Sequence, residues 1–232
     1  MNVIKYLLSF PKTLYFNFKV FPLHIAIKCP CFLHYNTKIG SIRKNSIEIL
    51  SNIKPGMIKF GCGMGSKGVF EGEYPRSSGG GYIHIEPTCK LIFKGNATFA
   101  GGISLRLDNG GRIEFGKNFG CNSYCFIASN KLIKFGDNCT IGWNVKIRDT
   151  DGHKIFWKDD PEREQINLNR EVVIGDHVWI AAHVKILKGT VIGNDNIVAY
   201  GTMITGQQFM DNNCIIGGNP PRIIKKNIGW DF

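Results

Sequence analysis

The stretch VIGDHVWIAAHVKILKGTVIGNDNIVAYGTMIT, residues 173–205, repeats a large aliphatic side chain at every sixth position. The repeated side chains are Ile174, Ile180, Ile186, Ile192, Val198 and Ile204. A period of six fits neither an α-helix nor one long strand, so the chain must turn before each repeat ends. A fixed short period of this kind is typical of a parallel β-helix, in which each repeat is one short strand and a corner and the aliphatic side chain points into the shaft.

The residues between these aliphatic positions favour turns. Asp176-His177, Lys188-Gly189 and Asn194-Asp195 are turn-prone or polar, and Asn, Asp and Gly tolerate the left-handed backbone that tight corners need. The spacing continues upstream in three groups: Phe135, Ile141 and Ile147; Phe115, Cys121 and Ile127; Phe93, Phe99 and Leu105. The register slips where these groups join, by two residues between Ile127 and Phe135 and by four between Leu105 and Phe115, which indicates enlarged corners in one solenoid rather than separate domains.

One elongated all-β domain is therefore expected for the chain of 232 residues. We expect an apolar N-terminal cap segment over residues 1–38, a parallel β-helix over 39–218 with a protruding loop at 148–173, and a short C-terminal tail at 219–232. Each buried inward side chain contributes roughly 1.5–3 kcal/mol before entropy is subtracted. Because a coil buries its faces only against its neighbours, the fold is stable only as a stack.

Charge and cysteine content narrow the classes of partner. The net charge of +11 favours an anionic partner, which includes a phosphorylated cofactor, an acidic glycan or a membrane surface. The lysines are scattered and no nucleic-acid-binding motif is present, so nucleic acid is excluded as a partner. The eight cysteines form no facing CxxC pairs, and structural zinc is excluded. Without an evident cleavable signal, we expect free thiols and a cytoplasmic location.

No metal is expected from the histidines either. His177 and His183 occupy equivalent positions in consecutive repeats, which places them on different faces of a three-sided coil. Two side chains on different faces converge on one ion only with difficulty. We therefore predict that the protein binds no metal.

The N-terminal 35 residues are apolar and aromatic, with lysines at positions 5, 12, 19 and 28 and prolines at 11 and 22. No uncharged stretch approaches the ~20 residues that a membrane-spanning helix needs. A cap over the first coil is one interpretation of this segment. A cationic amphipathic segment that makes peripheral contact with an anionic membrane is the other.

The repeat is interrupted between Ile147 and Ile174 by a long excursion that begins with Arg148-Asp149-Thr150-Asp151-Gly152-His153. A loop that leaves a rigid scaffold is a common place for catalysis. Neutral imidazole accepts a proton near pH 7, so His153 is a candidate general base. Either Asp149 or Asp151, or a backbone carbonyl, would hold its other ring nitrogen. An ordinary surface histidine is the alternative interpretation.

Four segments together resemble the hexapeptide-repeat acyltransferases with a left-handed β-helix, in particular the branch that O-acetylates sugars and surface polysaccharides. They are the hexapeptide run, Asp149–Ile155 with His153, Ile174–Ile180, and the closing Gly218-Asn-Pro-Pro-Arg222-Ile-Ile-Lys225. The resemblance is strong over residues 113–228 and implies a left-handed helix. It also implies a homotrimer with active sites between subunits, where His153 deprotonates an acceptor hydroxyl that attacks acetyl-CoA directly.

The resemblance also implies positions for acetyl-CoA along one solenoid edge. Ala182 matches a small residue against which the pantetheine arm packs, whereas Tyr200 stands where Ala or Gly is usual. Thr205-Gly206 stands where a Thr-Lys pair is usual, so one phosphate-side cation is missing. Arg222 and Lys225 match cations near the nucleotide phosphates. The alternative for these two is a solvated basic tail.

For the acceptor, Asn122 matches a position that hydrogen-bonds sugar hydroxyls, and Trp143 and Trp179 are candidates for stacking on a sugar. Capping a corner, for Asn122, and packing between subunits, for the tryptophans, are the alternatives. The implied function is O-acetylation of a sugar in a bacterial capsule, lipopolysaccharide or exopolysaccharide pathway. N-acetylation of an amino sugar or antibiotic, and an inactive scaffold, remain as alternatives because one histidine base serves either nucleophile.

Overall fold

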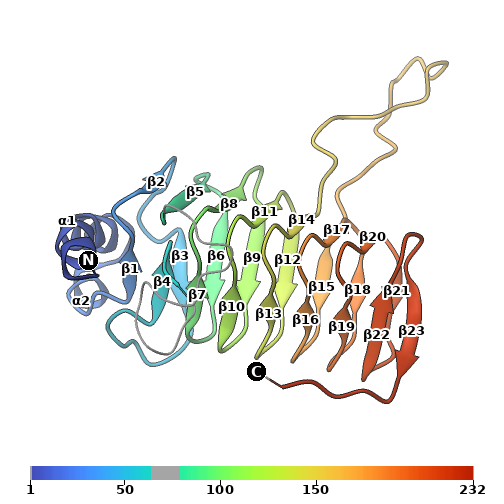
Figure 1. The fold of residues 1–232 in the computed structure, drawn as a ribbon. Helices are drawn as coiled ribbons and strands as arrows, with labels where there is room; N and C mark the ends of the chain where they lie inside the picture. The colour runs from blue at the N-terminus through green and yellow to red at the C-terminus, as the bar shows by residue number, and fades with distance from the viewer. Residues whose placement is uncertain (1, 64–78, 232) are drawn as a thin grey trace.

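The computed structural model describes residues 2–63 and 79–231, and within them the chain winds as a left-handed, three-sided parallel β-helix (Figure 1). Residues 64–78 of the expected β-helix segment lie outside the described residues. The fold class predicted from the six-residue period is confirmed. Successive strands of each coil belong to three sheets, which we call A, B and C in the order in which the chain visits them.

Among the described residues, sheet A has nine strands and sheets B and C have seven each. Sheet A contains β1 (Cys31–Leu33), β4 (Ile58–Phe60), β7 (Ala97–Phe99), β10 (Phe119–Cys121), β13 (Thr140–Ile141), β16 (Trp179–Ile180), β19 (Ile197–Val198), β22 (Cys214–Gly217) and β23 (Arg222–Lys226). Sheet B contains β2 (Thr37–Ile39), β5 (Gly81–Ile85), β8 (Ile103–Leu107), β11 (Phe126–Ser129), β14 (Lys146–Arg148), β17 (Lys185–Leu187) and β20 (Met203–Thr205). Sheet C contains β3 (Ile47–Ile49), β6 (Lys90–Phe93), β9 (Arg112–Phe115), β12 (Leu132–Phe135), β15 (Val172–Ile174), β18 (Val191–Ile192) and β21 (Gln208–Phe209).

The repeated aliphatic side chains stack in register along the shaft. Ile174 pairs with Ile192, Ile180 with Val198, and Ile186 with Ile204. Each of the six strict positions is at most 1% exposed. The core therefore consists of columns of identical or similar side chains, as the period predicts.

The register slips upstream have a simple structural cause at the corner between sheets B and C. Strands β8 and β11 each continue to a second buried residue, Leu107 and Ser129, before the chain turns. The coil from Leu105 to Ile127 has 22 residues and that from Ile127 to Ile147 has 20, against 18 from Ile186 to Ile204, so the aliphatic spacing shifts by four and by two residues. The slips are enlarged corners of one solenoid, which confirms that interpretation.

Corners between sheets C and A use the left-handed backbone that the sequence predicts. His177 and Asp195 have φ values of 52° and 57°. Side chains at these corners also form a ladder: Asp176 Oδ1 accepts a hydrogen bond from the Asp137 N–H, and Asn194 Oδ1 accepts one from the Asp176 N–H, both at 2.8 Å. The polar corner residues thus satisfy backbone donors of the preceding coil.

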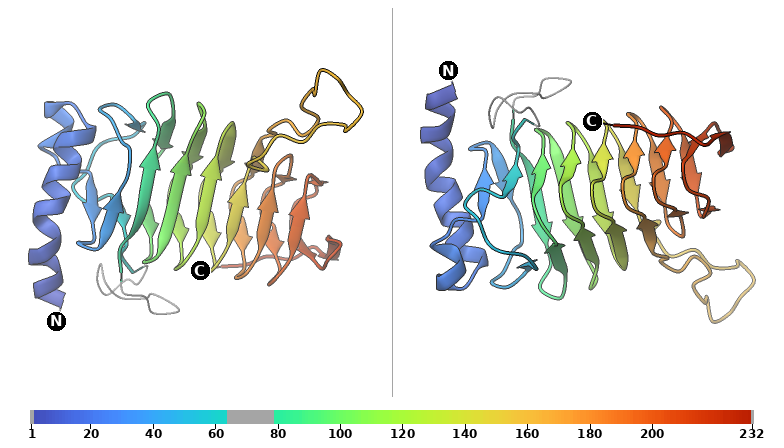
Figure 2. Two further views of the ribbon diagram at one scale, coloured as in Figure 1. Left: turned by 90° about the horizontal axis from the view of Figure 1, so that it is seen from above. Right: turned by 90° about the horizontal axis from the view of Figure 1, so that it is seen from below.

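The N-terminal end of the stack is closed by α1 (Asn2–Val20), followed by α2 (Leu23–Ala26); α1 runs across the solenoid end in both views of Figure 2. The first coil begins at Cys31, inside the segment 1–38 that we expected to be a cap. Its strand β1 pairs with β4 on one side and leaves the other edge open. An open edge exposes unpaired N–H and C=O groups.

Three polar side chains of α1, spaced four residues apart, satisfy that open edge. Asn17 Nδ2 donates to the Cys31 carbonyl at 2.7 Å, and Asn17 Oδ1 accepts from the Cys31 N–H at 3.1 Å. Thr13 Oγ1 accepts from the Leu33 N–H at 3.0 Å, and Ser9 Oγ accepts from the Tyr35 N–H at 3.1 Å. One face of α1 therefore takes the place of the missing neighbouring strand.

Substitution Asn17→Ala should destabilise this end of the β-helix. It leaves the buried N–H and C=O of Cys31 without partners, and an unsatisfied buried polar group costs about 1–3 kcal/mol. Urea unfolding followed by circular dichroism should show a loss of about 2 kcal/mol or more. The matched control is Leu7→Ala on the exposed face of the same helix, which should leave the midpoint unchanged; equal effects of the two substitutions would contradict the edge-capping role.

Candidate active site

The predicted loop leaves the β-helix between β14, which ends at Arg148, and β15, which begins at Val172. It projects away from the solenoid at the B–C edge, the corner between sheets B and C (Figure 1). The coils on either side of it stay in register, because Ile141 pairs with Ile180 across the excursion. A loop on such a scaffold starts and ends at fixed points. His153 lies near its outgoing root and is exposed.

Asn167, on the returning half of the loop, fixes the backbone around His153. Its Nδ2 donates to the His153 carbonyl at 2.8 Å and to Asp151 Oδ2 at 2.9 Å. Its Oδ1 accepts a hydrogen bond from the Ile155 N–H at 2.8 Å. The outgoing residues 151–155 are therefore held in one conformation by a single amide side chain.

Lys188, on the following coil, clamps both stems of the loop. Its Nζ forms an ion pair with Asp151 at 2.5 Å. It also donates to the carbonyls of Asn167 and Leu168 at 3.0 and 3.2 Å. Its side chain is 13% exposed, so these contacts are shielded from water. The sequence presented Lys188 as an ordinary corner residue, and its role at the loop root was missed.

The pKa of Asp151 reflects this clamp. Partial burial raises the pKa of the Asp151 carboxyl, but the hydrogen bonds from Lys188 and Asn167 outweigh burial and bring it below its ordinary value. The carboxylate form is therefore stabilised by the folded loop. Because the pKa is lowered, the contribution of this pair is present above the ordinary carboxyl pKa and is lost as the pH falls through the folded-state value.

Asp149 does not orient His153 in this structure. It is fully buried, and its carboxylate accepts hydrogen bonds from Ser129 Oγ at 2.6 Å, the Asn130 N–H at 2.7 Å and the Lys131 N–H at 2.9 Å. These partners belong to the corner of the preceding coil. With Asp151 committed to Lys188, neither aspartate contacts the His153 imidazole within the described part of the chain.

A second group of predicted residues lies on the A–B edge, where the chain passes from sheet A to sheet B. Asn122, Trp143, Ala182 and Tyr200 occupy equivalent corners of four successive coils. Ala182 is 3% exposed and Tyr200 is 65% exposed. The ring of His183 lies near two of these side chains, 6.4 Å from the Trp143 ring centroid and 5.0 Å from that of Tyr200. We call this edge the aromatic ridge, because Trp143, His183 and Tyr200 lie around one small residue, Ala182.

The remaining predicted positions lie on the B–C edge and on sheet A. Thr205 ends β20 and Gly206 follows it on the B–C edge, whereas Arg222 and Lys225 are exposed on β23 at the end of sheet A. Trp179, on sheet A, lies 6.1 Å from Trp230 between ring centroids. The predicted site residues therefore do not converge within one chain, since the width of sheet B separates the loop from the A–B edge.

Arg170 occupies the space beside Gly206 that the sequence left without a cation. A Cβ atom on Gly206 would lie 3.0 Å from a terminal guanidinium nitrogen of Arg170, and one on Gly189 would lie 2.9 Å from the guanidinium carbon. The two glycines thus make room for an arginine that arrives from the returning stem of the loop. Arg170 was not among the predicted residues because its position depends on the path of the loop.

A polar groove of about 440 Å³ lies on the outer face of sheet B beside the loop root. Arg106, Arg148, Asn130 and Thr150 are among the residues that line it. Arg106 is paired with Asp108 at 2.5 Å. Arg148 Nε is buried and has no hydrogen-bond partner among the described residues, so this guanidinium retains a donor for another group.

One cluster in the described residues has the composition of a metal site. The ligand atoms of His84, Glu86 and Asp108 lie within 4.8 Å of one another. These groups already have partners: Asp108 pairs with His84 at 3.4 Å and with Arg106, and Glu86 Oε2 accepts a hydrogen bond from the Asn109 N–H at 2.9 Å. We assign no metal to this cluster.

Comparisons with known proteins agree with the fold and with the repeat. The family model described as bacterial transferase hexapeptide (six repeats) matches residues 171–206. WbbJ of Escherichia coli K12, named as a lipopolysaccharide biosynthesis O-acetyl transferase, is 36% identical over 55% of this chain and 68% of its own length. The polysialic acid O-acetyltransferase of Escherichia coli O1:K1 is 32% identical over 42% of this chain and 31% of its own length. The crystal structure of the polySia-specific acetyltransferase NeuO has a TM-score of 0.55 and 24% identity over 65% of this chain and 63% of that chain.

Substitution Lys188→Met should loosen the loop root. Hydrogen exchange at the Ile155 and Ile166 amides, which are bonded within the loop, should accelerate by about tenfold or more because Asp151 and two carbonyls lose their cation. In the wild type, the protection should hold at neutral pH and fade below about pH 4. Lys185→Met, an exposed lysine on β17, the strand just before Lys188, is the control; the same acceleration in that variant would refute the clamp.

Proposed function

The chain belongs to the hexapeptide-repeat acyltransferases, and on that premise we propose that it transfers an acetyl group from acetyl-CoA to a sugar hydroxyl of a bacterial surface polysaccharide. The observation that carries the proposal is the loop root, where Asn167 and Lys188 hold the backbone on both sides of an exposed histidine. General-base catalysis requires a base at a defined position, and a fixed backbone at His153 supports that role. The names of the similar proteins support a sugar as the acceptor.

In the proposed reaction the neutral imidazole of His153 accepts the proton of the acceptor hydroxyl as that oxygen attacks the thioester carbonyl carbon. The new C–O bond forms, the C–S bond breaks, and the imidazolium returns the proton to the departing thiolate. A well-placed base contributes ~10²–10⁴ in rate. Backbone N–H groups near Ala181-Ala182 are the proposed donors to the developing oxyanion.

We propose a homotrimer in which the loop of one subunit faces the A–B edge of the next. Within one chain, His153 and the ridge with Ala182 lie on opposite edges of sheet B. The loop also exposes four large apolar side chains, which another subunit would cover. They are Ile155 at 51%, Trp157 at 69%, Ile166 at 44% and Leu168 at 65%.

For the cofactor, we propose that the pantetheine arm passes Ala182 and Tyr200 and that three cations contact the phosphates. Arg222 and Lys225 supply two of them, and Arg170 supplies the cation that is missing at Gly206. Thr205, next to Gly206, lies with Arg170 at the B–C edge, which the proposed trimer brings against the A–B edge of the next subunit. Arginine suits this role because its planar guanidinium binds phosphate oxygens in pairs.

For the acceptor, we propose that sugar hydroxyls contact Asn122, Trp143 and Trp179 of one subunit and that the groove with Arg148 holds an acidic or hydroxyl-rich part of the glycan. A guanidinium with a free donor beside the loop root favours an anionic group. We also propose a cytoplasmic location, supported by the eight cysteines, all of which are free thiols.

Substitution His153→Ala should lower kcat by about 10²–10⁴ because the general base is removed, with little change in the binding of acetyl-CoA. Release of free thiol from acetyl-CoA, measured with a panel of sugars and bacterial glycans, checks this. His24→Ala, an exposed histidine on α2 and outside the proposed site, is the control and should retain most activity. Transfer to an amine but not to a hydroxyl would favour N-acetylation, and absence of both acetyl-CoA binding and turnover would favour the scaffold.

A mixing experiment tests whether the site is shared between subunits. His153→Ala removes the base and Ala182→Trp blocks the proposed arm path, so each variant alone should be inactive. Refolded mixtures should regain activity, since some interfaces then combine an intact loop with an intact A–B edge. A mixture that stays inactive although it contains mixed oligomers would show that the site lies within one chain.

Substitution Arg170→Ala should raise the KM for acetyl-CoA by about tenfold or more, because a hydrogen bond to a charged group is worth about 1.5–3 kcal/mol, and should leave kcat nearly unchanged. Initial rates at varied acetyl-CoA concentration measure both constants. Arg112→Ala, a half-exposed arginine on β9 paired with Glu114, is the control. A fall in kcat without a rise in KM would instead assign Arg170 to the positioning of the loop.

A further inference from the structure

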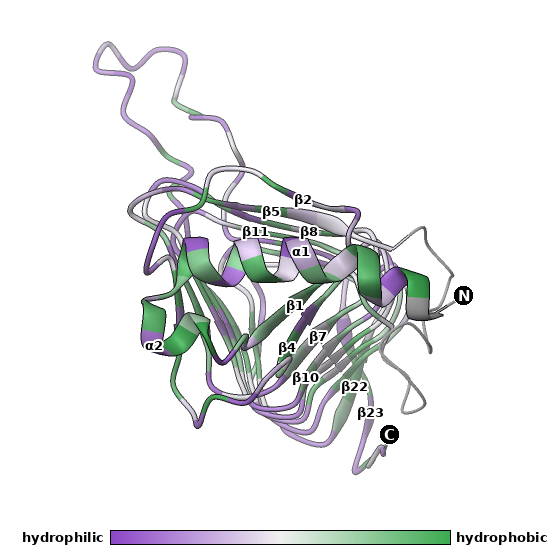
Figure 3. Ribbon diagram, turned by 90° about the vertical axis from the view of Figure 1, so that its left-hand side faces the viewer, coloured by the Kyte–Doolittle hydropathy of each residue, from purple (hydrophilic) through white to green (hydrophobic). Residues whose placement is uncertain are grey.

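The helix that closes the N-terminal end is apolar on its outer side. Toward the solenoid α1 buries Ser9, Thr13 and Asn17 beside Phe16 and Val20. Exposed large apolar side chains of α1, α2 and the adjoining Ile27 form what we call the end patch, and Figure 3 shows apolar residues along the ribbon of both helices. The end patch consists of Ile4, Leu7, Leu8, Phe10, Tyr15, Phe18, Leu23 and Ile27, with exposures between 48% and 69%. The β-helix uses the polar side of α1, which leaves the end patch exposed for another contact.

The end patch lies in the most strongly cationic part of the chain. Residues 1–47 contain Lys5, Lys12, Lys19, Lys28, Lys38, Arg43 and Lys44, and the first acidic residue is Glu48. Seven cations without an acidic residue give this segment +7 of the total charge of +11. An apolar face surrounded by cations is the pattern of helices that lie in the interface of an anionic bilayer.

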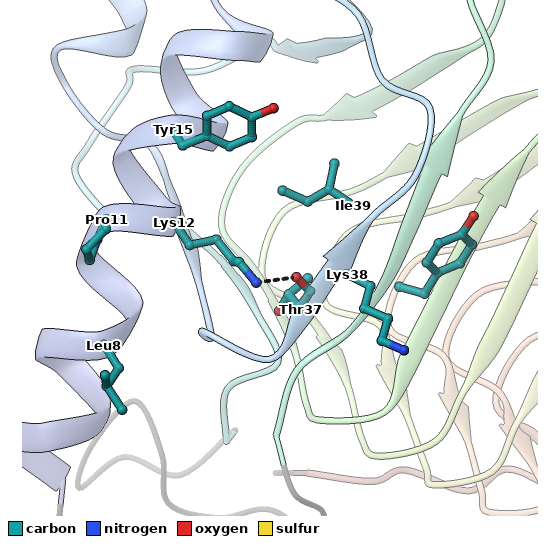
Figure 4. A pocket seen from close by; sticks show the side chains of 8 residues that line it. Leu8, Pro11, Lys12, Tyr15, Thr37, Lys38 and Ile39 are labelled. Carbon is teal, nitrogen blue, oxygen red and sulfur yellow. Dashed lines mark hydrogen bonds between the residues drawn. The ribbon is translucent and has the colours of Figure 1, made fainter.

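A groove beside α1 has the same mixed character (Figure 4). It measures about 820 Å³, and Leu8, Pro11, Tyr15 and Ile39 provide apolar walls. Two lysines stand in it: Lys12 Nζ donates to the carbonyls of Thr37, at 3.0 Å, and Tyr35, and Lys38 is exposed. Apolar walls with ammonium groups at the rim suit an acyl chain with an anionic head group.

We propose that the end patch docks this end of the β-helix on an anionic lipid bilayer, with α1 lying in the interface. Among the described residues no helix is both long and apolar enough to cross a membrane, so the contact is peripheral. A second copy of the chain is the less favourable occupant, because two end patches would bring +7 against +7. Like charges facing each other oppose association, whereas anionic head groups attract each of these cations.

The test is flotation of the full-length protein with two kinds of vesicle. One contains equal parts of phosphatidylglycerol and phosphatidylcholine, and the other phosphatidylcholine alone. The wild type should bind the anionic vesicles about tenfold or more tightly than the neutral ones, and added salt should weaken binding because it screens surface charge. No binding to anionic vesicles, or equal binding to both kinds, would overturn the proposal.

Two variants assign the contact to the end patch. Leu7→Glu with Phe10→Glu should weaken binding to anionic vesicles by about tenfold or more, since two apolar side chains no longer enter the interface. Met210→Glu, an equally exposed apolar position at the opposite end at 66% exposure, should bind as the wild type does. Both variants should keep the circular dichroism spectrum and urea midpoint of the wild type.

A charge variant makes the result independent of the apolar substitutions. Lys19→Gln with Lys28→Gln should weaken binding to anionic vesicles by about fivefold or more, whereas Lys134→Gln, an exposed lysine on sheet C, should not. If Leu7→Glu with Phe10→Glu lowers the molar mass in light scattering and leaves vesicle binding intact, the end patch is a protein interface and the proposal fails. None of these readouts depends on acetyl transfer.

Discussion

Hydrogen bonding between successive parallel coils is the constraint on which this molecule depends. Inside the stack every strand has a neighbour on both sides, so the backbone is satisfied and identical side chains stack into the core. The ends have no such neighbour. The chain closes one end with the polar side chains of α1 on β1, and at the other end β23 pairs antiparallel with β22. Both solutions shape the surfaces that are available for binding, because the element that closes an end also exposes its other side there.

The six-residue repeat made the fold predictable from the sequence. It did not predict the contacts at the loop root, where the repeat is interrupted. The period of six requires a buried column at Ile174 and its equivalents, and that column is present. The loop root depends on Lys188 and Asn167, which meet Asp151 only because the chain leaves the solenoid and returns. Periodicity carries no information on such contacts. Likewise Asp149 and Asp151, four and two residues before His153, are both candidates by sequence, but one faces a closed corner and the other a lysine; the role of His153 itself stays a prediction.

The N-terminal segment contains a regular polar stripe that its average apolar composition does not reveal. Its apolar composition suggested a cap or a membrane contact as alternatives, although the positions of Ser9, Thr13 and Asn17 at intervals of four define a polar stripe. Residues at such spacing share one helix face. With that stripe bonded to β1, the two interpretations are no longer exclusive. The helix closes the stack with one side and offers the other to a partner, because the two sides carry different chemistry.

The position of the loop relative to the end patch limits the acceptor that both proposals together allow. In sheet B, β2 lies beside the N-terminal end and β14 carries the loop, with β5, β8 and β11 between them. Four steps at the usual strand spacing amount to about 19 Å. A bilayer under the end patch would therefore lie at least that far from the root of the loop with His153, because α1 stands between the first coil and the bilayer. A sugar attached directly to the membrane would not reach the imidazole, whereas one several units out along a glycan chain would. The cations of the end patch and the candidate base thus favour a growing polymer over a single lipid-linked sugar.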